Sequence, residues 1–262
     1  MKQKVSDYIA DRLAQEGISQ VFTVTGGGAM HLNDSLGHHP GLSCLYHHHE
    51  QAAAMAAEAY ARVDNRMAAV CVTSGPGATN AITGALCAWM DSIPMLVLSG
   101  QVRYDTTVRH SGLKIRTMGV QEYDITPSVE PMTKYAVMVT DPLTIRYHLE
   151  RAIYLAKTGR PGPCWLDLPL NVQSAVVETD DLKAYDPSED AKELPAPVSE
   201  ETVKQILEKL KLASQPLIFA GHGIRLAGAY DEFQHLVELL GIPVVTGMSS
   251  IDLMESAHPL YV

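Results

Sequence analysis

Apolar runs alternate with amphipathic segments along most of the chain, which predicts strands and helices in turn. Met67 to Thr73 is a continuous apolar run, typical of a strand covered on both faces. Asp141-Pro142 offers a helix N-cap followed by proline, and that helix is expected to run to Gly159. The other predicted elements are helices between Val5 and Gly17, over Glu50–Arg62 and over Thr79–Met90, and strands over Val21–Val24, Leu42–Tyr46, Pro94–Ser99 and Cys164–Leu168.

This alternation predicts an α/β fold, a parallel sheet with helices on both faces, over residues 1–175. Acidic residues and prolines then cluster over 176–199, which indicates an exposed linker. Strand and helix patterns resume over 200–262 and include a predicted helix at Tyr230–Leu240. We expect this last part to be the beginning of a second, Rossmann-like α/β domain that is truncated.

Composition and charge narrow the class of protein. Of 262 residues, 46% are hydrophobic, and twenty Lys and Arg stand against thirty Asp and Glu, a net charge of −10. That charge argues against a nucleic-acid or anionic-membrane surface. No apolar run is long enough to span a membrane, and MKQKVSDYIADR lacks the apolar stretch of a signal peptide. The four cysteines form no CxxC pair, so we expect buried free thiols and a cytoplasmic protein.

Two glycine-rich segments follow predicted strands. Thr73–Asn80 reads TSGPGATN, and Thr25–Ala29 reads TGGGA. The first is not a Walker A loop or a nucleophile elbow, and it lacks the third glycine of a dinucleotide fingerprint. Because ligands bind at the carboxyl ends of parallel strands, two such turns favour a shared ligand site, although either alone is also typical of a tight structural turn.

The segment from His47 to Glu50 reads HHHE and invites a metal interpretation. Adjacent residues cannot all face one ion, and the zinc motif fails because residue 53 is Ala, so no metal ligands are assigned. Glu50 opens an Ala-rich helix, where an acid can simply complement the helix dipole. A third turn, Gly221–Arg225, follows a strand, but its G-x-G pattern is weak evidence for phosphate binding.

Longer stretches of the chain resemble the thiamine-diphosphate-dependent enzymes, most closely the acetolactate synthase (acetohydroxyacid synthase) group. The resemblance is carried, in this order, by the Gly26-Gly27 turn, HHHEQAAAMAAEAYAR, VCVTSGPGATNAITGALCAWMDSIPMLVLSGQV, GVQEYDI and TGRPGPCWLDLP. These segments span roughly residues 5 to 175, and weaker similarity continues to the end. The resemblance implies an N-terminal pyrimidine-binding domain followed by part of a central domain.

The resemblance also implies roles for individual residues. Glu50 is expected to hydrogen-bond N1′ of the aminopyrimidine and drive its 4′-amino/imino tautomer change, after which the imine removes the thiazolium C2 proton. Gln121 matches a substrate-pocket glutamine that stabilises the intermediate. The other expected cofactor contacts are Gly26, Gly27, Thr73, Pro76 and Asn80, with Arg160 matching an arginine that contacts FAD in flavin-containing members.

The chain departs from the family pattern at three places. Val24-Thr25 replaces the usual Tyr-Pro before the glycine pair, Val120 replaces Phe before Gln121, and Leu170 replaces the lysine after Asp-Leu-Pro. Because the last two lie near the substrate entrance in the family, they leave the acceptor open, and a keto-sugar remains an alternative. The segment Gly-Asp-Gly…Asn, which binds Mg²⁺ and the diphosphate in the family, is expected in a missing C-terminal domain.

The resemblance therefore implies decarboxylation of pyruvate and transfer of its two-carbon unit to a second carbonyl, in a homodimer or homotetramer with the active site between subunits. This chain alone is expected to be inactive. One alternative is an NAD(P)-dependent Rossmann oxidoreductase, for which Asp91 is the acid nearest the required offset but precedes its strand. The other is a non-catalytic regulatory protein.

Overall fold

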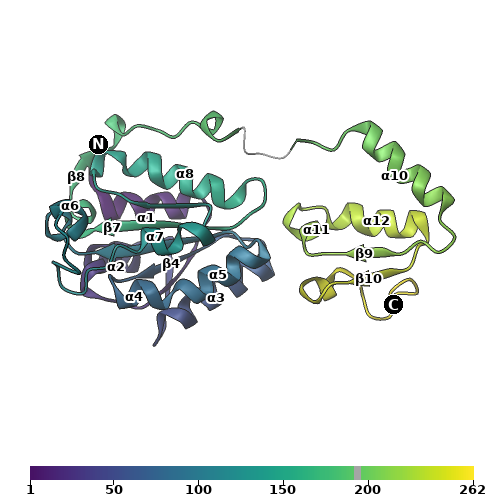
Figure 1. Cartoon of the computed structure of the whole chain (residues 1–262), viewed down its shortest axis with the longest axis horizontal. Helices are drawn as coiled ribbons and strands as arrows, with labels where there is room; N and C mark the ends of the chain where they lie inside the picture. The colour runs from purple at the N-terminus through teal and green to yellow at the C-terminus, as the bar shows by residue number, and fades with distance from the viewer. Residues whose placement is uncertain (192–195) are drawn as a thin grey trace. The chain divides into compact units, whose positions relative to one another are not determined.

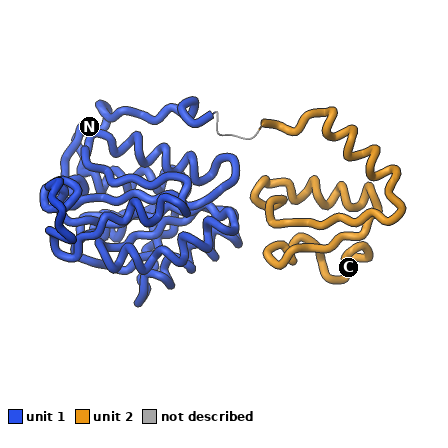
Figure 2. Tube along the Cα trace, in the orientation of Figure 1, with its two compact units in different colours: residues 1–194 blue, residues 195–262 orange. Residues whose placement is uncertain are grey.

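The computed structural model describes residues 1–191 and 196–262 of the chain. It divides into two compact units, Met1–Leu194 and Pro195–Val262, which are shown in different colours in Figure 2. Each unit is an α/β body with its own hydrophobic core. No helix among the described residues is long and apolar enough to cross a membrane.

A six-stranded sheet forms the centre of the first unit, and every pairing in it is parallel. Its spatial order is β3-β2-β4-β5-β7-β6. The strands are β2 (Gln20–Thr23), β3 (Ser43–Tyr46), β4 (Ala68–Val72), β5 (Met95–Gln101), β6 (Tyr135–Met138) and β7 (Pro163–Pro169). All five residues of β4 and all seven of β5 are buried, as their apolar runs predict.

Helices cover both faces of this sheet (Figure 1), which confirms the predicted fold class. Successive strand residues point to opposite faces, so Ala69 and Cys71 join one buried cluster while Val70 and Val72 join the other. The first cluster packs α1 (Val5–Gln15), α2 (Met30–His38), α8 (Ile145–Lys157) and α9 (Leu170–Gln173) against the sheet. The second packs α3 (Glu50–Asp64), α4 (Pro76–Asn80), α5 (Ile82–Asp91) and α7 (Thr126–Val129).

Short elements complete the first unit. The Asp141 side chain accepts a hydrogen bond from Leu143 N at 3.0 Å, as the predicted cap requires, and this turn leads into α8. The remaining short helices among the described residues are α6 (Val108–Ser111), η1 (Gly27–Ala29), η2 (Tyr104–Thr106), η3 (Glu130–Met132), η4 (Pro142–Thr144), η5 (Thr179–Asp181), η6 (Pro187–Glu189), α11 (Gly223–Leu226) and η8 (Met248–Leu253).

The segment that was expected to be an exposed linker over 176–199 packs in part on the first unit. β8 (Val176–Glu178) pairs antiparallel with β1 (Lys2–Lys4). Asp190 is buried and accepts hydrogen bonds from the Arg151 guanidinium at 2.8 and 2.9 Å. At least one acidic residue of this stretch, Asp190, therefore anchors it to α8 through Arg151. Residues 192–195 of the predicted linker lie outside the described residues.

The second unit contains α10 (Glu200–Leu212), β9 (Ile218–Ala220), α12 (Tyr230–Leu240) and β10 (Val244–Thr246). β9 and β10 are parallel, and α12 has the bounds that the sequence predicts. Its core consists of a few residues from these elements and the segment that follows them, with Phe233, Val237 and Val244 at its centre. No residue of α10 is buried.

Candidate functional site

The two glycine-rich turns lie side by side at the carboxyl edge of the sheet. β2 and β4 are paired neighbours, so the segments that follow them emerge together. Gly28 N donates to Thr73 Oγ1 at 3.0 Å, which ties one turn to the other. At Gly26 an added Cβ would lie 2.4 Å from Thr73 Cβ, so only glycine permits this approach. The two turns therefore form one continuous surface, as the sequence pattern suggests.

Gly75 sets the shape of the second turn. Its φ of +58° lies in the left-handed region, and Pro76 then occupies the first turn of α4. An added Cβ at Gly75 would lie 2.0 Å from the backbone oxygen of Gln121. This glycine therefore permits the segment carrying Gln121 to lie directly against the turn.

Glu50 is the first residue of α3 and is partly buried. The helix begins here because His49 has extended backbone geometry and its Nδ1 accepts from Gln51 N at 3.1 Å. Asn80 Nδ2 donates to Glu50 Oε2 at 2.9 Å, and among the described residues no side chain or backbone N–H donates to Oε1. A Cβ added to Gly77 would lie 2.6 Å from Thr73 Cγ2 and 3.4 Å from Glu50 Oε1, so glycine at this position lets the turn pack closely on Thr73 beside the carboxylate.

Gln121 lies between two cavities that share it and Gly119. The larger, about 660 Å³, is bordered by the first glycine turn and Thr73, and it also contains Val120 and Leu170 among its lining residues. The smaller, about 450 Å³, is bordered by the Gly75 turn. Gln121 itself is exposed, with a φ of +56°. The structure thus brings Gly26, Gly27, Thr73, Pro76 and Gln121 to adjoining cavities at one edge, with Asn80 and Glu50 paired nearby.

Sequence reasoning missed a buried polar network behind this edge. Asp167, on β7, accepts hydrogen bonds from Ser99 Oγ at 2.6 Å and from Gln101 Nε2 at 3.1 Å. Gln101 Nε2 also donates to the Tyr123 carbonyl at 2.8 Å, which connects the network to the segment carrying Gln121. Burial raises the pKa of Asp167 to about 7. The available signal was a carboxylate inside the apolar run CWLDLP, where a charge needs partners.

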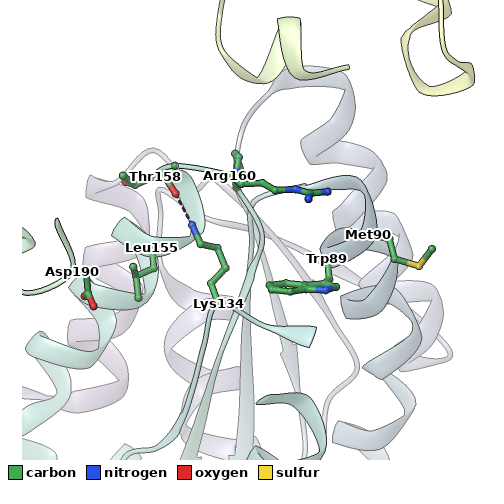
Figure 3. A pocket seen from close by; sticks show the side chains of 9 residues that line it. Trp89, Met90, Lys134, Leu155, Thr158, Arg160 and Asp190 are labelled. Atoms are coloured by element: carbon green, nitrogen blue, oxygen red, sulfur yellow. Dashed lines mark hydrogen bonds between the residues drawn. The ribbon is translucent and has the colours of Figure 1, made fainter. Parts of the chain in front are cut away.

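Arg160 is not part of this site. It precedes β7 and therefore lies at the amino edge of the sheet, where it borders a separate cavity of about 350 Å³. Its Nε donates to Ser92 Oγ at 2.6 Å. Figure 3 shows its guanidinium near the Trp89 indole, and Lys134 donating to the Thr158 carbonyl in the same cavity.

Asp91, the residue considered for ribose binding, also lies at the amino edge, at the end of α5. Arg62 donates to its carboxylate. Asp91 and the glycine turns therefore lie at opposite edges of the sheet. This geometry does not favour a nicotinamide dinucleotide, whose ribose needs an acid at the same edge as the turns.

The histidine run and the cysteines supply no metal site in the structure as described. Among the described residues, no group of three or more His, Cys, Asp or Glu could hold a metal ion. All four cysteines are free thiols, but only Cys71 and Cys164 are fully buried, so the expectation of buried thiols is correct for two of them. Burial raises the pKa of each of these two thiols to about 12, which keeps them unreactive.

Comparisons with known proteins agree on one family. The N-terminal TPP binding domain of the thiamine pyrophosphate enzymes matches residues 3–122, and the central domain of the same enzymes matches residues 203–262. The chain is 35% identical over 260 residues to the acetolactate synthase large subunit of Lactococcus lactis, covering 97% of this chain and 43% of that protein.

Two further relatives carry similar names. The chain is 32% identical to the large subunit of acetolactate synthase isozyme 3 of Escherichia coli, covering 97% of this chain and 43% of that protein. It is 37% identical to the acetolactate synthase large subunit of Corynebacterium glutamicum, covering 92% of this chain and 37% of that protein. The chain thus spans about two fifths of the length of these curated relatives.

Proposed function

The chain belongs to the thiamine pyrophosphate enzyme family, and from that premise we propose that it supplies the pyrimidine side of an acetolactate synthase-like active site. The reaction is the decarboxylation of a 2-keto acid, pyruvate, and the transfer of its two-carbon unit to a second carbonyl. One observation carries the proposal: a glutamate at a helix start is held by Asn80, beside glycine turns at the carboxyl edge of a parallel sheet.

The residues present fit an aminopyrimidine. A Cβ added at Gly77 or at Gly26 would collide with the Thr73 side chain, so the two glycines keep this surface bare for a flat ring. Asn80 donates to Glu50 Oε2, and Oε1 would accept a hydrogen bond from, or donate one to, a ligand nitrogen. Gly26, Gly27, Thr73 and Pro76 would line the ring through backbone and small side-chain atoms.

We assign each residue a part in the chemistry. When bound, thiamine diphosphate supplies the electron sink for the two-carbon unit. Glu50 Oε1 holds and exchanges one proton with a ring nitrogen, and Asn80 fixes the orientation of the carboxylate. Gln121, between the two cavities, donates or accepts hydrogen bonds at the reacting carbonyl. Val120 and Leu170 make the larger cavity more apolar on that side.

We further propose that Mg²⁺ and the diphosphate are held by groups outside this chain and that two subunits complete the site. The motif that holds them in the family does not occur in these 262 residues. Oxygen ligands around Mg²⁺ anchor a diphosphate well, and the described residues offer no such cluster. A homodimer or homotetramer would bring the glycine edge of one subunit against the diphosphate side of another.

The test uses the native protein that contains this chain, with every segment and subunit it has in the cell. Pyruvate, thiamine diphosphate and Mg²⁺ are added, and released CO₂ and the carboligation product are measured. The proposal expects CO₂ release that depends on thiamine diphosphate, together with a 2-hydroxy-ketone product such as acetolactate. Oxidation of NADPH or NADH with no CO₂ release would favour the oxidoreductase alternative, and binding without turnover would favour a regulatory protein.

We propose that Arg160 is the chain's contact for FAD, on the resemblance together with its surroundings. Its cavity offers a guanidinium and the aromatic face of Trp89, which suit a flavin nucleotide. We expect the purified native protein to show flavin absorbance, and Arg160→Gln to weaken FAD binding by about 10-fold, the loss of one charge-assisted hydrogen bond. Equal FAD affinity in the variant would remove Arg160 from this role.

A further inference from the structure

The segment from Arg103 to Arg116 carries a concentration of positive charge. It contains four Lys and Arg residues and His110, against one carboxylate, in a chain whose net charge is −10. This basic segment includes η2 and α6 and follows β5 directly. It therefore emerges at the carboxyl edge of the sheet, beside the glycine turns.

Two of its cations border the cavities on either side of Gln121. Arg103 lines the cavity of about 660 Å³, and Arg116 lines the cavity of about 450 Å³. Both cavities also contain Gly119 and Gln121, so one cation of the basic segment borders each of the two cavities beside Gln121, where the second carbonyl is expected to react. A cluster of cations at the mouth of a cavity raises the local concentration of an anionic ligand.

The cations of this segment differ in how they are neutralised. Arg103 pairs with Asp105 at 3.0 Å, and Arg109 lies 3.5 Å from Asp124. Lys114 and Arg116 are exposed and form no ion pair within 4.0 Å with any described residue. These two charges are thus the unneutralised part of the segment.

The acid that lines the smaller cavity together with Arg116 already accepts several hydrogen bonds. Glu122 also lines the smaller cavity, but its carboxylate accepts from the backbone N–H groups of Val108 at 2.7 Å, Met118 at 2.8 Å and Gly119 at 3.3 Å. Through these hydrogen bonds the Glu122 carboxylate stabilises the backbone conformation of the segment. Glu122 therefore does not neutralise Arg116, and an anionic ligand can still pair with this guanidinium.

We propose that Lys114 and Arg116 bind the phosphate group of the acceptor substrate, a carbonyl compound that carries a phosphate ester. The proposal rests on the proposed function, because it names the class of the second carbonyl. The Arg116 guanidinium, which borders the smaller cavity, suits a phosphate dianion, whose oxygens accept several charge-assisted hydrogen bonds. The exposed Lys114, two residues earlier in the same segment, adds a second positive charge. The donor pyruvate bears a single carboxylate and needs less positive charge than this segment supplies.

The test compares matched acceptors in the active native protein. Reactions contain pyruvate and either D-glyceraldehyde or D-glyceraldehyde 3-phosphate, and kcat/KM for the acceptor is measured. The variants are Lys114→Gln with Arg116→Gln together, and Arg66→Gln as a control that removes an exposed charge at the opposite edge of the sheet. Released CO₂ is recorded in every reaction.

We expect the phosphorylated acceptor to be preferred, and the double variant to lower its kcat/KM by about 10- to 100-fold, the loss of one or two charge-assisted hydrogen bonds. The unphosphorylated acceptor, and both acceptors in Arg66→Gln, should change less than about 2-fold. No preference for phosphate, or an equal loss for both acceptors, overturns the proposal. Dissociation of the subunits in the double variant, seen by sedimentation, also overturns it and places an acidic protein surface there.

Competition experiments separate two sources of the phosphate and keep the inference apart from the proposed function. Stronger inhibition by UDP than by ribose 5-phosphate supports a nucleotide-linked acceptor, the reverse supports a sugar phosphate, and inhibition by neither overturns the proposal. Normal CO₂ release without any phosphate effect contradicts only this inference. Absence of CO₂ release contradicts the proposed function, and calorimetric titration with UDP and with inorganic phosphate then still measures binding at Lys114 and Arg116.

Discussion

Glu50 is where a helix start, a glycine turn and an amide side chain meet. The position of a glutamate at the head of an Ala-rich helix could be predicted from the sequence, as could its neighbours on the turn after β4. Its contact with Asn80 could not, because the two residues are 30 positions apart and are brought together by the packing of α3 against α4. The buried network around Asp167 was equally hidden, since its partners come from another strand.

The network at Asp167 makes stability depend on pH. Because burial raises its pKa from 3.8 to about 7 in the folded protein, the folded state keeps a proton that the unfolded state releases. The stabilisation is complete below about pH 3.8 and is lost as pH rises to about 7. We expect the free energy of unfolding of the native protein to fall over this range by a few kcal/mol relative to Asp167→Asn, which cannot titrate.

Urea unfolding at several pH values checks this expectation. The informative quantity is the difference in the free energy of unfolding between the native protein and Asp167→Asn. The other carboxylates titrate in both proteins, so their contributions cancel in this difference. Asp190, whose pKa is lowered mainly by its hydrogen bonds from Arg151, works in the opposite direction but cancels in the comparison. A difference that is constant between pH 4 and pH 7 would contradict the assigned protonation of Asp167.

At the scale of elements, prediction succeeded where burial leaves a clear pattern. β4 and β5 are covered on both faces and appear as continuous apolar runs. α2 was not predicted because its sequence, MHLNDSLGH, is mostly polar and buries only Leu32, Leu36 and Ser35. β6 was missed because it is a four-residue edge strand. The predicted helix over Thr79–Met90 is divided at Ala81 into α4 and α5.

The turn between β4 and α4 has a testable requirement for Gly75. Gly75→Ala adds a Cβ both to a backbone with φ of +58° and to a space filled by the Gln121 carbonyl. We expect a loss of about 1–3 kcal/mol in the free energy of unfolding and displacement of the Gln121 segment. Urea unfolding measures the first, and loss of Gln121-dependent carboligation at normal thiamine diphosphate affinity reports the second.

Two glycines serve as matched controls for that change. Gly112 has a φ of +64° with no atom within 4 Å of an added Cβ, so Gly112→Ala measures the backbone strain alone. Gly27 has neither positive φ nor a nearby atom, and Gly27→Ala should leave stability within about 0.5 kcal/mol. If Gly75→Ala destabilises no more than Gly112→Ala, the contact with Gln121 does not constrain the turn.

At the scale of the whole molecule, the two units differ in how much core they possess. The first has buried clusters on both faces of a six-stranded sheet, whereas the second has one small cluster around two paired strands. The alternation of strands and helices predicted both units. It could not predict where the first ends, because the packing of 176–191 depends on distant residues such as those of β1 and α8.

This difference predicts unequal protection of backbone amides. We expect amides of β9 and β10 to exchange with deuterium at least about 10-fold faster than those of β4 and β5, since local opening of a small core costs less. α10, with no buried residue, should exchange fastest of the long helices. Exchange measured by mass spectrometry on this 262-residue chain by itself checks this, and equal protection of β9 and β5 would show that the size of the buried cluster does not set the protection.

The most direct test of the account is C2 proton exchange of bound thiamine diphosphate in the native protein, comparing Glu50 with Glu50→Gln. Glutamine keeps the size of the side chain but cannot take up the proton. Glu130→Gln, at an exposed glutamate, is the control, and calorimetry confirms that each variant binds the cofactor. The account predicts that exchange slows by about 10²- to 10⁴-fold in Glu50→Gln and is unchanged in Glu130→Gln. Exchange at the native rate in cofactor-loaded Glu50→Gln would contradict it.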